Sequence, residues 1–171
     1  MPRLTAQQFL DESIYRQTRV VRYATGQVNV IRSIVDQLNE KIARYCIRKE
    51  IIETKAQYQD CRVHIRKLCL DYRNKTYKYL QKELKGFIRE QATWVKEHSP
   101  VELKVPRDTI KQSARDAFFV AFSDTDNVKS YVTRIFNQIF QLWNAQLTIA
   151  YRIGTPAKEM AKNITGKDYR K

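Results

Sequence analysis

Glycine and proline are scarce in this sequence, with only four of each among 171 residues. Folds rich in strands need many turns, where these residues are favoured, whereas the interior of a helix needs neither. Their scarcity therefore indicates long helices. Hydrophobic residues make up 43% of the chain and aromatic residues 11%, which is enough to build a core and argues against wholesale disorder.

Motifs that carry catalysis are also absent. The sequence has no glycine-rich phosphate loop, no Gly-x-Ser-x-Gly elbow and no His-Glu-x-x-His pair. Its two histidines, His64 and His98, are far apart, and isolated histidines on helices are more often structural than catalytic. No apolar run approaches the roughly 18 residues that a membrane span requires. We therefore predict a non-enzymatic protein that has no cofactor and no membrane span.

Cysteine is rare and odd in number, at positions 46, 61 and 69. An odd count without paired spacing argues against a disulfide framework. All three residues fall in helical patterns beside apolar residues, where small buried thiols are more common than metal ligands. The sequence therefore predicts free thiols in a reducing compartment and no metal site.

Apolar residues recur with helical spacing through most of the chain. A first helix can be capped by Thr5, and Gly26 is expected to mark a kink or a turn after it. The clearest periodicity predicts long helices over residues 25–50 and 54–97, joined as an antiparallel hairpin. At about 1.5 Å per residue, such helices should make an elongated molecule whose apolar faces need a neighbour, so we expect a homo-oligomer.

The two prolines Pro100 and Pro106 bracket a segment that we expect to be extended. This segment predicts three regions: a helical arm over residues 1–99, a linker over 100–107 and a C-terminal helical unit over 108–171. Within the last region, Gly154 suits the end of one helix, and a final helix is expected from residue 156 to 164. The predicted fold is thus all-α, a long antiparallel helical hairpin with a small C-terminal helical unit.

Positive charge exceeds negative charge along the whole chain, giving a net charge of +14. Residues 1–56 hold ten Lys or Arg against six Asp or Glu, residues 57–98 ten against five, and residues 99–171 twelve against seven. The excess is larger than the charge of about 2–8 that solubility asks of a small domain. A surface of this kind attracts polyanions, with nucleic acid as the first candidate and an acidic protein surface as the second.

Five basic residues of the second long helix recur at intervals of three and four, which places them on one side as a basic ridge. These are Lys75, Lys78, Lys82, Lys85 and Arg89. Three tyrosines, Tyr72, Tyr77 and Tyr79, interleave them and could stack on bases. The alternative is a solvated face whose tyrosines turn into the core. We predict non-specific contacts of the ridge with the DNA backbone. Further candidates for nucleic-acid binding are Arg62 and Arg66, and those for partner binding are Phe136, Phe140 and Trp143.

The order of these segments resembles the phage head morphogenesis family, the minor head proteins related to the F protein of phage Mu. Residues 20–28 resemble its helical arm, with two apolar residues followed by the pattern Arg-Tyr-x-x-Gly-x-Val, and residues 31–38 continue the match. Residues 79–94 stand in the place of a helix with a tyrosine–leucine pattern and an acidic, aromatic end. An extended link at 100–102 follows. The most specific match is the Gly-to-Ile segment at 154–164.

This resemblance implies a low-copy virion protein, made in the host cytoplasm and located inside the head or at its portal vertex. It implies the portal or other head proteins as partners, contact with packaged DNA, and a role in head assembly or DNA ejection. Typical members continue beyond the position of Lys171, so the chain is expected to be a short variant or a fragment. Two alternatives stay open: a cytoplasmic helical module that binds nucleic acid, and a head–tail adaptor or similar structural interaction protein.

Overall fold

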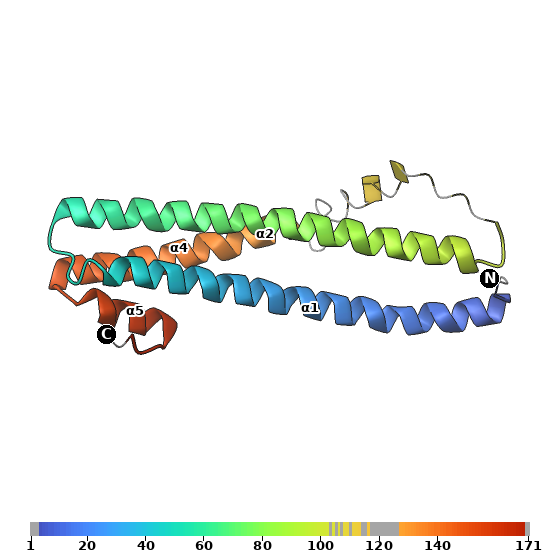
Figure 1. Ribbon diagram of the computed structural model, residues 1–171, viewed down its shortest axis with the longest axis horizontal. Coiled ribbons are helices and arrows are strands. Elements are labelled where there is room, and N and C mark those ends of the chain that lie inside the picture. Colours follow the sequence, from blue (N-terminus) through green and yellow to red (C-terminus); the bar gives the residue numbers. More distant parts are fainter. Residues whose placement is uncertain are drawn as a thin grey trace. The chain divides into compact units, whose positions relative to one another are not determined.

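A computed structural model shows the helical fold that the sequence predicts (Figure 1). The structure describes residues 4–102, 104, 106, 108–109, 111–113, 116 and 127–169. Of these residues, 85% are helical and none lies in a strand. The main helices are α1 (Ala6–Ile47), α2 (Lys55–His98), α4 (Val128–Ile153) and α5 (Ala157–Thr165). None of the helices in this part of the chain is both long and apolar enough to span a bilayer.

Each of the three long helices begins with a reciprocal pair of capping hydrogen bonds. At α1, the Gln8 amide donates to Thr5 Oγ1 (3.3 Å) and the Thr5 amide donates to Gln8 Oε1 (3.0 Å). Thr54 and Gln57 make the same pair before α2, and Asn127 and Ser130 a similar pair at α4. These side chains satisfy amides that the first helical turn leaves without a partner. The capping role predicted for Thr5 is confirmed.

Gly26 does not interrupt α1, so the break predicted there is wrong. The helix runs without interruption from Ala6 to Ile47, and its predicted beginning near residue 25 lies well inside it. A glycine costs a helix about 1 kcal/mol relative to alanine. Packing against α2 can offset this cost, since Tyr23, three residues before Gly26, stacks on Phe87. The bounds predicted for the next helix, 54–97, differ from those of α2 by one residue at each end.

We expect Gly26→Ala to raise the free energy of unfolding by about 1 kcal/mol. Gly26 is exposed, and a Cβ built there would meet nothing within 4 Å. The matched control is Gly166→Ala, which should lower stability because Gly166 has a φ of 67°. Chemical denaturation followed by circular dichroism measures both effects. Equal changes for the two variants would contradict this explanation.

The chain divides into two compact units, each built from parts of α1 and α2. Unit 1 comprises residues 1–31 and 77–130, and unit 2 comprises residues 32–76 and 131–171. Unit 1 therefore takes residues 6–31 of α1 and 77–98 of α2, and unit 2 takes the rest of both helices. The predicted regions 1–99, 100–107 and 108–171 stay a prediction. The described residues of the predicted linker (100–102, 104 and 106) are not helical.

Unit 2 contains most of the buried core. Its fully buried residues come from all four helices and the connection between α1 and α2, and they include Leu38, Ile42, Ile52, Ile65, Val132, Trp143, Leu147 and Met160. Tyr45 Oη lies 2.7 Å from Asp60 Oδ2, and the Lys41 ammonium lies over the Tyr72 ring. Tyr45 thus contacts Asp60, whereas the earlier residue Lys41 contacts the later residue Tyr72. The two helices therefore run antiparallel in unit 2.

Unit 1 is thinner. Among its described residues, only Leu80 and Ser99 are buried. Phe9 stacks on Trp94 with ring centroids 5.1 Å apart, and Tyr23 stacks on Phe87 at 4.4 Å. Here too α1 and α2 run antiparallel, which confirms the predicted hairpin.

The C-terminal helices end where the sequence predicts. Gly154 and Gly166 adopt positive φ angles of 71° and 67°, as expected for residues that follow a helix. Pro156 precedes the first residue of α5 instead of occupying it, a difference of one position from the prediction. The Ala157 amide donates to the carbonyl of Glu50 at 2.8 Å, which fastens α5 to the connection between α1 and α2 within unit 2.

Candidate nucleic-acid interface

The basic ridge lies on the exposed side of α2. Four of its members, Lys78, Lys82, Lys85 and Arg89, belong to unit 1, and all four are exposed. The fifth, Lys75, is an exposed residue of unit 2 whose ammonium lies 5.2 Å from the centre of the Tyr72 ring. On a helical wheel the four lie opposite Phe87, the residue through which α2 contacts α1 in unit 1. Helical periodicity thus places these charges away from that contact.

The ridge residues of unit 1 repel one another. Lys78 and Lys82, and likewise Lys85 and Arg89, stand four residues apart, a spacing that costs a helix about 0.2–0.5 kcal/mol for each like-charged pair. No carboxylate of the described chain lies within ion-pair distance of these four side chains. Solvated helix faces usually intersperse acidic residues among the basic ones. A row of uncompensated positive charge is instead what the phosphates of a nucleic acid would neutralise.

The three tyrosines that interleave the ridge are buried or half-buried. Tyr72 is only 6% exposed, so it cannot offer its ring to a base. Tyr77 is half-buried and its hydroxyl donates to the Lys129 carbonyl at 3.2 Å, and Tyr79 is half-buried as well. The stacking role that the sequence allowed is therefore wrong for Tyr72. Charge, without aromatic stacking, is the property that the ridge offers to a ligand.

The remaining sequence-predicted site residues lie in unit 2. Arg62 and Arg66 are exposed. Trp143 is fully buried and Phe136 is 2% exposed, which corrects their predicted role in partner binding: both belong to the core. Phe140 is half-buried. A groove of about 320 Å³ is lined by Arg66, Cys69, Leu70, Arg73, Phe136, Asn137 and Phe140, so it brings together residues predicted for two different roles.

Sequence reasoning missed a cluster around Trp94 in unit 1. The Arg16 guanidinium lies 4.1 Å from the centre of the Trp94 ring, and its Nη1 donates to Gln91 Oε1 at 3.2 Å. Burial lowers the pKa of Arg16. His98 stacks on Trp94 at 5.2 Å. A groove of about 620 Å³ beside this cluster is lined in part by Arg89 of the ridge. The spacing of Trp94 and His98, four residues apart, was the one available signal.

The second histidine and two of the cysteines are packed at the other end of α2, in unit 2. His64 stacks on Tyr45 with ring centroids 3.6 Å apart, and burial lowers the pKa of His64. The hydrogen bond that the Cys46 thiol donates to Cys61, together with burial, raises the pKa of Cys46, while the same hydrogen bond lowers the pKa of Cys61. Burial raises the pKa of Cys69 to about 12. All three thiols are free and buried, as predicted.

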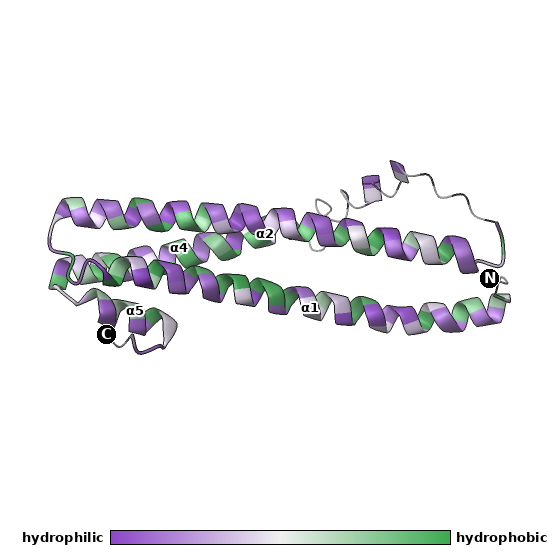
Figure 2. Ribbon diagram, in the orientation of Figure 1, coloured by the Kyte–Doolittle hydropathy of each residue, from purple (hydrophilic) through white to green (hydrophobic). Residues whose placement is uncertain are grey.

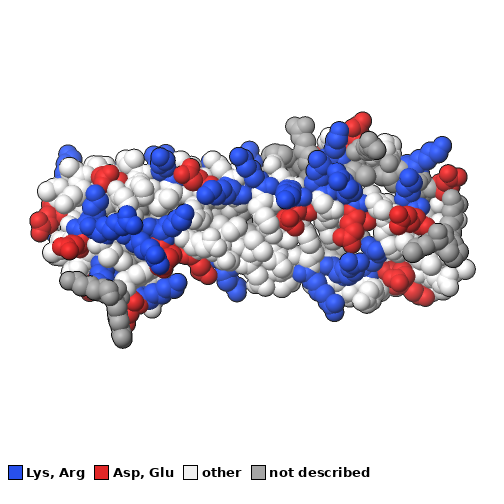
Figure 3. All heavy atoms as spheres, in the orientation of Figure 1, with Lys and Arg blue, Asp and Glu red and all other residues white. Residues whose placement is uncertain are grey.

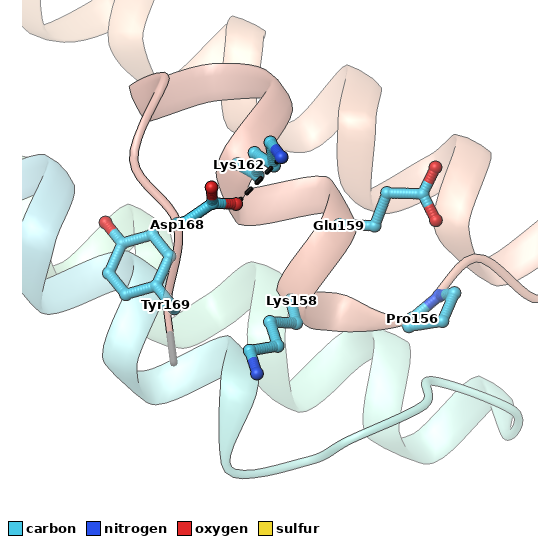
Figure 4. A pocket seen from close by; sticks show the side chains of 6 residues that line it. All are labelled: Pro156, Lys158, Glu159, Lys162, Asp168 and Tyr169. Carbon is cyan, nitrogen blue, oxygen red and sulfur yellow. Dashed lines mark ion pairs between the residues drawn. The ribbon is translucent and has the colours of Figure 1, made fainter. Parts of the chain in front are cut away.

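Two further hollows lie around α5 in unit 2. One, of about 410 Å³, is lined by Pro156, Lys158, Glu159, Lys162, Asp168 and Tyr169. Figure 4 shows Lys162 pointing to Asp168, at 2.7 Å, while Lys158 and Glu159 point away from this pair. The other, of about 720 Å³, contains Arg44, which pairs with Glu40. Carboxylates pair with Lys162 and Arg44, whereas Arg48 and Lys158 have none within ion-pair distance among the described residues. The hollows therefore hold fewer uncompensated cations than the ridge and are weaker candidates for an anion.

Positive charge is not confined to the ridge. Lys and Arg side chains are spread along the face drawn in Figure 3, with Asp and Glu among them. In the part of the chain that the structure describes, no three His, Cys, Asp or Glu side chains are grouped as metal ligands would be. No family model, no curated protein and no solved structure matches this chain.

Proposed function

We propose that this chain is a non-enzymatic structural protein that holds nucleic acid by its phosphate backbone. The observation that carries the proposal is the row of exposed, uncompensated basic residues on α2. Phosphates spaced along a nucleic acid would relieve the repulsion within this row. Contacts to phosphates carry no sequence information, so binding should be independent of base sequence.

The setting that we propose is the head of a tailed phage, where the chain would act as a minor head protein inside the head or near its portal. The support for this setting is the ordered resemblance of residues 20–28, 79–94 and 154–164 to the phage head morphogenesis family. Packaged DNA and the portal or other head proteins would be its partners. The role would be head assembly or DNA ejection.

Two experiments test the two levels of the proposal. The first is a salt titration of binding to duplex DNA of random sequence, in which the logarithm of affinity should fall linearly with the logarithm of salt concentration. The absence of measurable binding at low salt would overturn the nucleic-acid role and favour an adaptor that meets an acidic protein. The second measures the stoichiometry of the chain in purified virions. A fixed low copy number is expected, and absence from the particles would favour a cytoplasmic nucleic-acid-binding module.

A further inference from the structure

Two of the three cysteines meet in the core of unit 2. Cys46 lies in the last turn of α1 and Cys61 in the second turn of α2, and both side chains are fully buried. The Cys46 thiol donates a hydrogen bond to the Cys61 sulfur. The residues just before them are also in contact, since Tyr45 Oη lies 2.7 Å from Asp60 Oδ2. The two helices therefore hold these sulfur atoms within reach of each other.

Helical spacing explains why the two thiols meet. α2 is the more hydrophilic of the two helices (Figure 2), and its buried residues in unit 2 recur at intervals of three and four, which places them on one side. The buried residues of unit 2 are Leu38, Ile42, Ala43 and Cys46 on α1 and Cys61, Ile65, Cys69, Tyr72 and Thr76 on α2. Because the helices run antiparallel, the last buried position of α1 faces the first buried position of α2. Both positions are cysteine.

We propose that Cys46 and Cys61 form a reversible redox site, at which a small disulfide such as oxidised glutathione converts the two thiols into an intramolecular disulfide. The structure holds both cysteines in the free, reduced form. In the oxidised form, the new bond would close a loop over residues 47–60 and join α1 to α2 covalently within unit 2. This inference goes beyond the proposed function and does not rest on it.

Thiol–disulfide exchange supplies the chemistry. Cys61 releases its proton to water, and its thiolate attacks one sulfur of glutathione disulfide, so that the S–S bond breaks and one glutathione thiolate leaves. Cys46 then releases its proton, and its sulfur attacks the Cys61 sulfur of the mixed disulfide and displaces the second glutathione thiolate. The two leaving thiolates take up two protons from water. The two cysteines thus lose two electrons, and glutathione disulfide is reduced to two thiols.

The hydrogen bond sets the order of the two steps. Cys61 attacks first, because the hydrogen bond that it accepts from Cys46 stabilises its thiolate and lowers its pKa. Cys46 is then already placed against the Cys61 sulfur, which is the atom that it must attack to resolve the mixed disulfide. Two sulfur atoms that are hydrogen-bonded to each other need only small shifts of the flanking side chains and backbone to form a disulfide.

Burial makes the first step slow. Glutathione disulfide can reach Cys61 only when this end of the hairpin opens, since neither thiol is exposed. Cys46 is one residue from the end of α1, where helices fray. The ion pair between Lys49 and Asp60, at 2.9 Å, is partly exposed and therefore holds this end only weakly. We expect oxidation of the folded chain to take minutes to hours.

Cys69 provides an internal comparison. It is 4% exposed and lies eight residues after Cys61, which is about 12 Å along α2 at 1.5 Å per residue. A disulfide requires the two Cα atoms to lie within about 7 Å of each other. Cys69 therefore cannot pair with Cys61, and we expect it to stay a free thiol while Cys46 and Cys61 are oxidised.

The disulfide should stabilise unit 2 against unfolding. Closing a loop of about 15 residues is expected to lower the unfolding equilibrium constant roughly hundredfold, because it restricts the unfolded chain. Coupling between two equilibria is reciprocal, so folding should raise the equilibrium constant for oxidation by glutathione by the same factor, relative to the chain in denaturant. The redox state of the surroundings would thus set the stability of unit 2.

Oxidation of the full chain in mixtures of reduced and oxidised glutathione tests the site, with alkylation of the remaining thiols and mapping of the peptides by mass spectrometry. We expect one intramolecular disulfide, between Cys46 and Cys61, with Cys69 alkylated. The oxidised chain should have a thermal midpoint roughly 5–10 °C higher, and dithiothreitol should reverse the shift. A disulfide that includes Cys69, a disulfide between chains, or a lasting glutathione adduct would each overturn the proposal.

Cysteine variants separate the pair from the third thiol. Cys46→Ala and Cys61→Ala should each abolish both the disulfide and the midpoint shift, with helix content checked by circular dichroism. The matched control is Cys69→Ala, which removes another buried thiol and should keep both. If a variant fails to fold, the wild-type chain still decides, through its equilibrium constants for oxidation with and without denaturant. A folded chain that is oxidised no more favourably than the denatured chain would show that the two thiols are only core residues.

Discussion

Replacing Lys78, Lys82 and Lys85 with glutamine is expected to reduce the salt dependence of DNA binding by about two to three units of slope. Each phosphate that a cation neutralises adds about 0.9 to the slope of log affinity against log salt concentration. The three residues are exposed and lack carboxylate partners in the described chain, so their charge is available to a ligand. Affinity at low salt should fall strongly for every DNA sequence alike.

Folding of this triple variant should be nearly unaffected, since exposed substitutions usually change stability by no more than about 0.5 kcal/mol. The matched control changes Lys55, Lys67 and Lys158, which are also exposed but belong to unit 2, to glutamine. It removes the same net charge, so a general loss of attraction would affect both variants equally. We expect the control to lower the slope by less than one unit. If affinity and slope are unchanged in the ridge variant, the ridge is only a solvated helix face.

Much of the fold could be predicted because it depends on local patterns. The 3.6-residue period identifies α2 and α4 as helices, and the capping residues Thr54 and Asn127 locate where these helices begin. The positive φ angles of Gly154 and Gly166 are expected because glycine, which has no Cβ, adopts them without strain. These signals lie within a few residues of the feature that they predict. The exposure of the ridge was predictable for the same reason, since it follows from helical spacing.

The errors arose where distant packing decides. Gly26 lowers the local helix propensity, but α1 continues across it without interruption. Phe136 and Trp143 are large aromatic residues that the sequence predicts to contact a partner, yet both side chains are buried in the core of unit 2. A stripe of aromatic residues has the same spacing whether its neighbour is this chain or another.

The burial of Trp143 leads to the largest stability effect that we expect. Trp143→Ala should lower the free energy of unfolding by about 3–5 kcal/mol, because it removes a large side chain and leaves a cavity. Trp143 is fully buried in unit 2, and its indole nitrogen donates to Asn39 Oδ1 at 2.9 Å. Asn39→Ala removes the acceptor alone and should cost about 1–3 kcal/mol. Chemical denaturation of the full chain measures both.

Trp94→Ala serves as the comparison, because Trp94 is half-buried in unit 1 and its loss should cost less than that of Trp143. Trp143→Phe keeps most of the volume but leaves Asn39 without its donor, so it should fall between the alanine variant and the wild type. The order of these losses in the free energy of unfolding separates the contribution of packing from that of the hydrogen bond. If Trp143→Ala cost less than 1 kcal/mol, Trp143 would not belong to the core, and its aromatic ring would again be free for the partner that the sequence suggested.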